Sequence, residues 1–289
     1  MLAEQLQEAE EKVPQQRRAV RSLPRPFLKW VGGKTQLLPA FEAFLPSSWG
    51  RYFEPFVGGG AMFWRNSDGP SVLNDFNPDL ATTYRVVRDD VEGLIEALSE
   101  HYYDKDHYYE VRALRERHLI GVQRAARMIF MNRTGFNGLY RVNKSGRFNV
   151  PFGRYKDPLS CDEPNLRACS ARLQETELRE GDFEEAIADA KSGDFVYFDP
   201  PYAPVSRSAN FTSYTAGGFG GTEQDRLRAT LADLDRRGVQ FMLSNSDAEG
   251  LYDMYRDDGW NVTKVRASRS INSKASRRGK VNELVVRNY

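Results

Sequence analysis

The chain has 289 residues, of which 40% are hydrophobic and 28% charged, a composition typical of a folded, water-soluble protein with a sizeable core. It contains no run of about 18 apolar residues, and its acidic start, MLAEQLQEAEEK, differs from a secretory signal, so we expect neither a membrane span nor export. Two cysteines and three histidines, none in a metal-ligand spacing, exclude a disulfide framework and argue against a metal centre.

The net charge of +1 hides an unequal distribution of charge along the chain. Residues 112–156 hold eleven basic side chains and one acidic side chain, and residues 264–280 hold seven basic side chains and no acid. The remainder is therefore strongly acidic. Two basic segments on an acidic body indicate binding to a polyanion, although solvated helix faces would give the same pattern.

The first half of the chain predicts the start of a nucleotide-binding fold. We expect residues 1–25, which contain Pro14 and Pro24, to form a flexible N-terminal extension. A helix is expected at residues 34–45, a strand ending near Phe53, a glycine turn at residues 58–60, a helix from Ala61, and a strand at residues 71–74 that leads to Asp75. This order is typical of a doubly wound α/β sheet.

Residues 77–175 have a helical and basic pattern, which predicts a subdomain inserted into a catalytic domain of residues 26–76 and 176–289. Helices are expected at residues 79–88, 91–101, 108–119 and 123–132, and a loop or β-hairpin at residues 133–155. After the insertion, the pattern predicts strands at residues 194–198, 239–245 and 281–289, with a helix at residues 223–237 before the second of them.

The tetrapeptide Asp199-Pro200-Pro201-Tyr202 follows directly on a predicted buried strand, where open α/β sheets bind their ligands. The Asp199 carboxylate and the Pro200 carbonyl offer two acceptors for an amino group, and Tyr202 offers a face for a flat heterocycle. The lone pair of a conjugated amine is delocalised into its ring. Hydrogen bonds from both N–H groups to these acceptors favour a pyramidal nitrogen, which frees the lone pair for attack. A proline-rich turn without chemistry is the alternative interpretation of this segment alone.

Taken with KWVGGK at residues 29–34 and FEPFVGGG at residues 53–60, this segment resembles the Dam-like D12 class, α-group, of DNA adenine-N6 methyltransferases. The resemblance covers about residues 27–289. It implies a Rossmann-like doubly wound methyltransferase sheet with an inserted, mainly helical DNA-recognition subdomain that contains a β-hairpin. It also implies transfer of a methyl group from S-adenosylmethionine to N6 of an adenine flipped out of double-stranded DNA, without a metal, by a cytoplasmic protein associated with the nucleoid through DNA.

The resemblance assigns several residues to the cofactor. Lys34 would lie near its carboxylate, Asp75 would bind its ribose hydroxyls, and Asp182 and Phe183 would lie beside its adenine. The match at Asp182 and Phe183 is short, and a plain turn would explain it equally well. The full set of implied cofactor residues is Trp30, Lys34, Phe56, Gly58, Gly60, Asp75, Asp182, Phe183 and Asp199.

The same resemblance assigns catalytic and DNA-binding residues. Asp199, Pro200 and Tyr202 would be catalytic and would hold the flipped base. Arg141 would bind O6 and N7 of a guanine, and Phe136 would insert between base pairs. Leu139 on a thymine methyl and Lys29 on a further base would complete a GATC target. The implied DNA contacts are Lys29, Arg133, Phe136, Asn137, Leu139, Arg141, Asn143, Asn149 and Arg154.

Other functions remain to be weighed against this one. A nicotinamide oxidoreductase shares the glycine turn and Asp75, but it does not explain residues 199–202. A C5-cytosine methyltransferase needs a Pro-Cys nucleophile, whereas Ser160 precedes Cys161 and Ala168 precedes Cys169. Another amino acceptor and a non-catalytic DNA-binding protein of the same fold stay open. A cognate restriction endonuclease as partner, the biological role and the oligomeric state stay open as well.

Overall fold

The computed structural model describes residues 24–115, 118–202, 221–268 and 280–289. Its strands are β1 (Tyr52–Glu54), β2 (Ser71–Asp75), β3 (Thr176–Glu180), β4 (Phe195–Phe198), β5 (Gln240–Ser246), β6 (Asn261–Ser268) and β7 (Lys280–Arg287). They form one sheet in the order β3-β2-β1-β4-β5-β7-β6. β1 to β5 are parallel, and β7 is antiparallel to both of its neighbours. This arrangement confirms the predicted α/β class.

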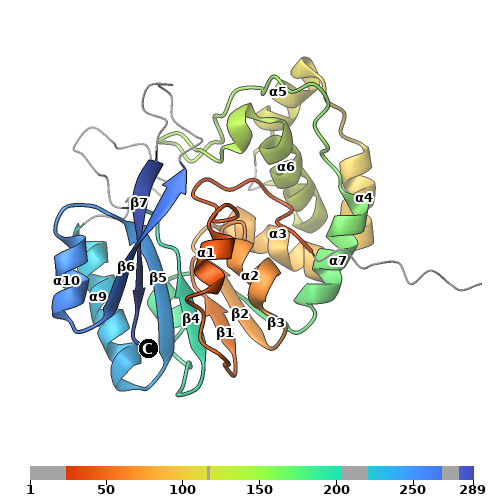
Figure 1. The fold of residues 1–289 in the computed structure, drawn as a ribbon. Helices are drawn as coiled ribbons and strands as arrows, with labels where there is room; N and C mark the ends of the chain where they lie inside the picture. The colour runs from red at the N-terminus through yellow and green to blue at the C-terminus, as the bar shows by residue number, and fades with distance from the viewer. Residues whose placement is uncertain (1–23, 116–117, 203–220, 269–279) are drawn as a thin grey trace, which may run out of the picture.

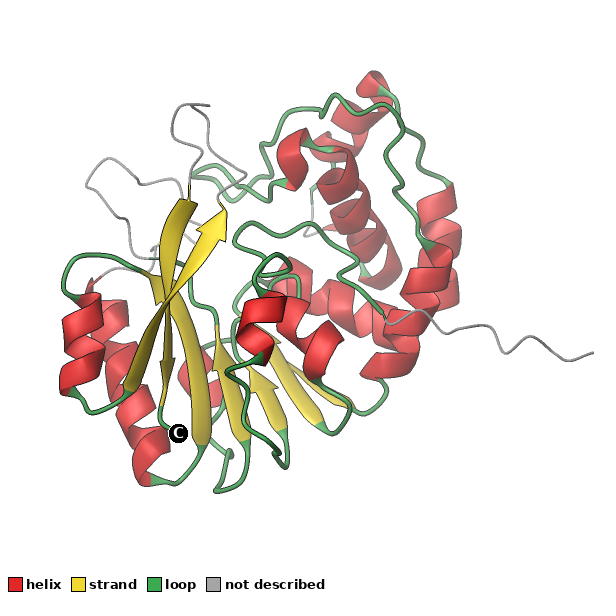
Figure 2. Ribbon diagram, viewed as in Figure 1, coloured by secondary structure: helices red, strands yellow, loops and turns green. Residues whose placement is uncertain are grey.

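The described α-helices fall into two groups by their place in the chain (Figures 1 and 2). Five helices lie in the chain between β2 and β3 and gather beside the sheet: α3 (Pro78–Asp89), α4 (Val91–Ser99), α5 (Lys105–Ala113), α6 (Gly121–Thr134) and α7 (Glu163–Leu173). The others are α1 (Leu38–Glu42), α2 (Ala61–Asn66), α8 (Phe183–Ala186), α9 (Gly221–Arg236) and α10 (Leu251–Asp257). The first group is called the helical unit below.

Both faces of the sheet are buried against a hydrophobic core, and successive side chains of a strand point to opposite faces. In β4, Phe195 and Tyr197 belong to the core shared with α1, α2 and the helical unit. Val196 and Phe198 belong to a second core, to which α9 and α10 contribute Leu231 and Tyr255. All residues of β4 are buried, so this central strand is apolar throughout, as expected for a sheet covered on both sides.

The order of the strands sets the place where a ligand can bind. The chain runs from β1 outward to β2 and β3, and then crosses to β4 on the other side of β1. The loops after β1 and β4 therefore leave in opposite directions and open a crevice at the carboxyl ends of these strands. Glu54 ends β1, and Asp199 directly follows β4. The four residues 199–202 thus begin at this crevice.

The structure corrects two predicted helices. The helix expected at residues 34–45 is the shorter α1. It begins later because residues 34–37 form a turn, in which the Lys34 carbonyl accepts hydrogen bonds from Leu37 N and Leu38 N. The helix expected at residues 108–119 is α5, which begins at Lys105 because the Asp104 side chain accepts hydrogen bonds from two backbone N–H groups of its first turn. Leu114 then takes an extended ψ of 141° and ends it.

Residues 135–152, called the recognition hairpin below, form the predicted hairpin in an irregular version. Single antiparallel bridges join Gly135 to Phe152 and Val142 to Phe148. Asn143 closes the turn, because its Oδ1 accepts hydrogen bonds from Ser145 N and Arg147 N, both at 3.0 Å. The segment therefore has a defined path without becoming a pair of regular strands.

The start of the described chain is fixed to α7. Arg25 N donates to Asn165 Oδ1 at 3.0 Å, and Asn165 Nδ2 donates back to Arg25 O at 3.0 Å. The Arg25 guanidinium also pairs with Asp162. The last residue of the predicted flexible extension is therefore anchored, and residues 1–23 lie outside the described residues. Within the described ranges, no helix is long and apolar enough to cross a bilayer, and no cluster of side chains could hold a metal ion.

Candidate active site

A buried ion pair lies where β4 ends. Lys34 Nζ is 2.7 Å from Asp199 Oδ1, and the two side chains are 3% and 19% exposed. Lys34 Nζ also donates to Gly32 O at 2.8 Å and lies 4.6 Å from the centre of the Tyr202 ring. Ser244 Oγ, on β5, donates to the same Asp199 oxygen at 3.2 Å. The structure thus brings together Lys34, predicted to bind the cofactor, and Asp199 and Tyr202, predicted to be catalytic.

The charge state of this site depends on burial and on Lys34. Burial raises the pKa of Asp199, whereas the charge and hydrogen bond of Lys34 lower it. Nearby, Glu54 is 2% exposed and accepts a hydrogen bond from Tyr52 OH at 2.7 Å. Burial raises the pKa of Glu54 to about 8, so this carboxyl is protonated at neutral pH. The positive charge of Lys34 is then available to balance the negative charge of Asp199.

Glu54 is a site residue that sequence reasoning missed. Its signal was a single acid at the end of an otherwise apolar strand, with Tyr52 two residues earlier and hence on the same face.

The glycine turn after β1 joins the ends of β1 and β2. Gly58 N donates to Asp75 Oδ2 at 3.1 Å, and Asn77 N donates to Asp75 Oδ1 at 2.9 Å. Gly58 has φ 49° and Gly60 has φ 68°, both in the left-handed region. A Cβ on Gly58 would lie 2.6 Å from Trp30 Cδ1, so only glycine fits there. Burial raises the pKa of Asp75 to about 6.

The remaining predicted cofactor residues are Phe56, Asp182 and Phe183. The Phe56 ring lies 5.2 Å from that of Phe183 and 6.4 Å from that of Phe198. Asp182 caps α8, since its Oδ1 accepts from Glu184 N, and the same oxygen accepts from the Arg226 guanidinium, both at 2.9 Å. One oxygen of Asp182 is therefore already engaged within the protein, and its contact with a cofactor adenine stays a prediction.

The predicted DNA-binding residues divide by exposure. The exposed ones include Lys29, Phe136, Asn137, Arg141 and Arg154, and Phe136 has 49% of its residue surface accessible. Leu139 and Asn149 are partly buried in the recognition hairpin, and Asn143 is exposed and used in its own turn. Arg133 departs from this group. It is only partly exposed at the end of α6, where burial lowers its pKa.

A buried asparagine that the sequence analysis did not single out connects Lys29 to the recognition hairpin. Asn132, fully buried in α6, accepts from Lys29 N at 2.8 Å. Its Nδ2 donates to Lys29 O at 2.7 Å and to Gly138 O at 2.9 Å. A polar residue inside an apolar helix face was the signal that could have identified it.

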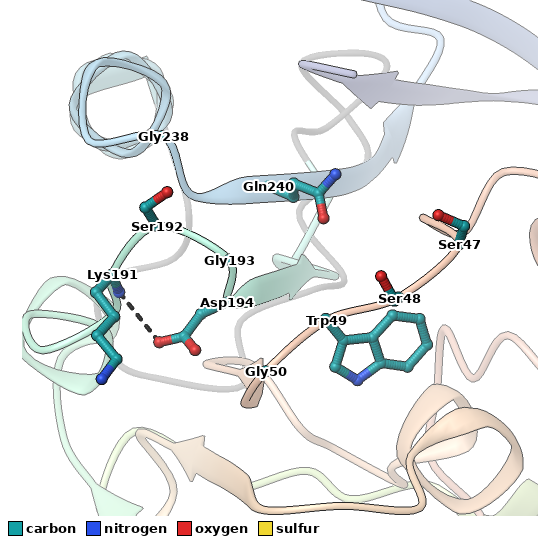
Figure 3. Close-up of a pocket in the computed structure, with 10 residues that line it drawn as sticks. All are labelled: Ser47, Ser48, Trp49, Gly50, Lys191, Ser192, Gly193, Asp194, Gly238 and Gln240. Carbon is teal, nitrogen blue, oxygen red and sulfur yellow. Dashed lines mark hydrogen bonds between the residues drawn. The ribbon is translucent and has the colours of Figure 1, made fainter.

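A hollow of about 660 Å³ lies elsewhere on the molecule (Figure 3). It is lined by residues that precede β1, β4 and β5, among them Trp49, Gly50, Gly193 and Gly238. These residues lie at the amino ends of the parallel strands, the edge of the sheet opposite to Asp199. None of the predicted site residues lines this hollow, so it is separate from the candidate site.

Comparison with known proteins agrees with this geometry. Residues 30–271 match the family model of D12 class N6 adenine-specific DNA methyltransferases. The chain is 44% identical over 273 residues to the type II methyltransferase M1.LlaDCHI of Lactococcus lactis, with 92% of this chain and 95% of that protein covered. It is 42% identical over 290 residues to the type II methyltransferase M.MjaIII of Methanocaldococcus jannaschii, with 92% and 99% covered. It is 35% identical over 266 residues to a DNA adenine methylase of Escherichia coli, with 91% and 94% covered. The chain belongs to the D12 class of N6 adenine-specific DNA methyltransferases.

Proposed function

We propose that this DNA adenine methyltransferase acts on an adenine flipped out of the sequence GATC in duplex DNA, with S-adenosylmethionine as the methyl donor. The observation that carries the proposal is the buried pair of Lys34 and Asp199 at the carboxyl end of β4, beside the glycine turn. Its place at the crevice of a doubly wound sheet is where such folds bind ligands.

The residues beside this pair fit the proposed cofactor. Gly58 lets Trp30 pack directly against the glycine turn, because a Cβ there would collide with the indole ring, and two of the predicted cofactor residues are thus in contact. Asp75 offers a partly buried carboxylate at the end of β2 for two ribose hydroxyls, and Lys34 offers a buried cation for the carboxylate of the methionine part. S-adenosylmethionine would supply the methyl group to be transferred.

On this proposal, the protein's own groups position and activate the acceptor. The Asp199 carboxylate and the Pro200 carbonyl would accept hydrogen bonds from the two N–H groups of adenine N6, and the Tyr202 ring would lie against the base. Because the methyl moves in one direct displacement, holding donor and acceptor in line supplies most of the rate. A negative Asp199 is the better acceptor, and Lys34 favours that state.

Base flipping and target choice would fall to residues 77–175, which contain the helical unit and the recognition hairpin. N6 of adenine lies inside the duplex stack, so the base must leave it before reaction. The exposed Phe136 ring, next to Asn137 in a left-handed conformation with φ 55°, has the form of an inserting aromatic side chain. Arg141 Nε donates to Asn149 Oδ1 at 2.7 Å, which holds the guanidinium for contact with guanine O6 and N7. Leu139 and Lys29 would complete GATC.

The test is transfer of tritium from labelled S-adenosylmethionine to three duplexes. One carries GATC, one carries a scrambled site, and one carries GATC already methylated on both strands. We expect label on the first alone, recovered as N6-methyladenine. The Asp199→Ala variant should lose transfer and keep DNA binding, whereas Asp253→Ala, at an exposed carboxylate on α10, should behave as wild type. Equal label on the scrambled duplex would overturn GATC, and full activity of Asp199→Ala would overturn the catalytic assignment.

A further inference from the structure

Tyr140 lies between the proposed cofactor site and the proposed target-binding side chains. Its ring stacks on that of Trp30, with 5.6 Å between ring centres and an angle of 28° between the ring planes. In the chain it separates Leu139 from Arg141, the two hairpin residues proposed to contact bases. One ring therefore touches a cofactor residue and belongs to the target-binding segment.

The opposite strand of the recognition hairpin also contacts this ring. Phe148, which is buried, meets it edge-on with 5.7 Å between ring centres. The next residue, Asn149, is the one whose side chain holds Arg141. Tyr140 thus contacts both Trp30 and the hairpin segment that holds Arg141.

The hydroxyl end of Tyr140 is fixed to the helical unit. Tyr140 OH donates to Asp79 Oδ2 at 2.7 Å. Asp79 lies in the first turn of α3, is nearly buried, and pairs through its other oxygen with Arg124 of α6. A hydrogen bond to a buried carboxylate of this kind is stronger than one between neutral groups. This hydrogen bond therefore holds the hydroxyl end of the ring against the helical unit.

The backbones on both sides of the stack are held together as well. Asn132 binds both Lys29 N and Lys29 O, next to Trp30, and also binds Gly138 O, two residues before Tyr140. Trp30 also packs on Gly58, with no space for a methyl group between them. A ligand that presses on the glycine turn or on Trp30 will therefore also press on Tyr140, since close-packed groups transmit small displacements.

We propose that Tyr140 is a positioning residue that couples occupancy of the cofactor site to the setting of Arg141 and Leu139 for their target sequence. This inference rests on the proposed function. Coupling of two ligands is reciprocal, so a bound cofactor analogue tightens binding to the target duplex by the factor by which the duplex tightens binding of the analogue.

The experiment measures the Kd of S-adenosylhomocysteine with and without a saturating GATC duplex, in the full chain. We expect a wild-type ratio of at least about 5, the lower end of typical couplings. Tyr140→Leu removes the stack and the hydroxyl, and its ratio should fall to about 1. Tyr140→Phe keeps the stack and should fall between the two. Tyr102→Leu, at an exposed ring stacked on His107, is the matched control and should keep the wild-type ratio.

Each outcome decides the inference. A ratio of 1 in the wild type, or an unchanged ratio in a folded Tyr140→Leu variant, overturns it. Should Tyr140→Leu not fold, as judged by thermal unfolding, Tyr140→Phe decides, and a wild-type ratio in that variant overturns it. A wild type that methylates GATC while Tyr140→Leu keeps full coupling overturns the inference alone. A wild type that neither binds nor methylates duplex DNA overturns the proposed function, and the inference with it.

Discussion

Lys34 controls the charge of the residue proposed to be catalytic. It is buried, its Nζ contacts Asp199 directly, and the neighbouring Glu54 is protonated at neutral pH. A buried carboxylate without its cation holds a proton to higher pH, because the uncharged form needs less solvation. Lys34 therefore has a role beyond that of a predicted cofactor contact.

Lys34→Met should shift the pH dependence of methyl transfer. Lys34 lowers the pKa of Asp199, so removal of the cation raises that pKa. Asp199 then keeps its proton up to a higher pH. The activity that protonation suppresses therefore appears at a higher pH in the variant than in wild type. The acidic limb of the kcat profile should thus move upward, and Lys34→Arg should restore most of it.

Lys191→Met, which changes an exposed lysine at the opposite edge of the sheet, is the control for this measurement. An acidic limb at the same pH in Lys34→Met and wild type would contradict the assignment of Lys34 as the counter-ion of Asp199.

At the scale of elements, the turn between β1 and α2 leaves no room for a side chain at Gly58. It reverses the chain over residues 55–60, binds Asp75 through Gly58 N and packs against Trp30. The segment of residues 29–34 in turn reaches Asp199 through Lys34. Gly58 thus contacts both Asp75 and the segment that carries Lys34.

Gly58→Ala should weaken cofactor binding. The new Cβ would lie 2.6 Å from Trp30 Cδ1, and alanine would have to adopt φ 49°. We expect the Kd of S-adenosylhomocysteine to rise by about tenfold or more, with a loss of roughly 1 kcal/mol in the free energy of unfolding. Gly69→Ala is the control, since a Cβ there meets nothing within 4 Å. Unchanged affinity in Gly58→Ala would show that the turn does not shape the cofactor site.

At the scale of the whole molecule, a net charge of +1 coexists with a basic segment in and around the helical unit. Arg141, Arg147 and Arg154 are all exposed there. The strongly basic residues 264–280 begin in β6 and end in β7, and residues 269–279 lie outside the described residues. An acidic body with basic segments orients a polyanion at long range, and that attraction is screened by salt.

Arg154→Ala and Arg141→Ala should therefore have different effects on DNA binding. We propose that Arg154 contacts a phosphate of the DNA backbone. Arg154→Ala should therefore weaken binding to all sequences alike and reduce the slope of log K against log salt by about 1. Arg141 should cost about 1–3 kcal/mol of discrimination at one base pair. Arg236→Ala, at an exposed arginine of α9, is the control. Equal discrimination in Arg141→Ala and wild type would remove Arg141 from the proposed base contacts.

Several elements could be predicted from the sequence because their signals are local. A glycine run between an apolar strand and a helix, and a continuous apolar strand before Asp199, correctly placed β1, α2, β2 and β4. The sequence analysis missed α7, β3, α8, α10 and β6. In β6, NVTKVRAS, polar and apolar residues do not alternate regularly, and the strand lies at the edge of the sheet. Its fold depends on pairing with β7 rather than on its own pattern.

The sequence by itself determined the fold class, the family and the residue types around a cofactor and a base, since these follow from motifs a few residues long. Only the tertiary structure decided that Lys34 leaves its expected helix to neutralise Asp199, and that Tyr140 and Asn132 join residues 29–30 to the recognition hairpin. The physical reason is burial. A charge or an amide taken out of water must find its partner wherever the fold supplies one, and the partners of Lys34 and Asn132 include residues more than 100 positions away.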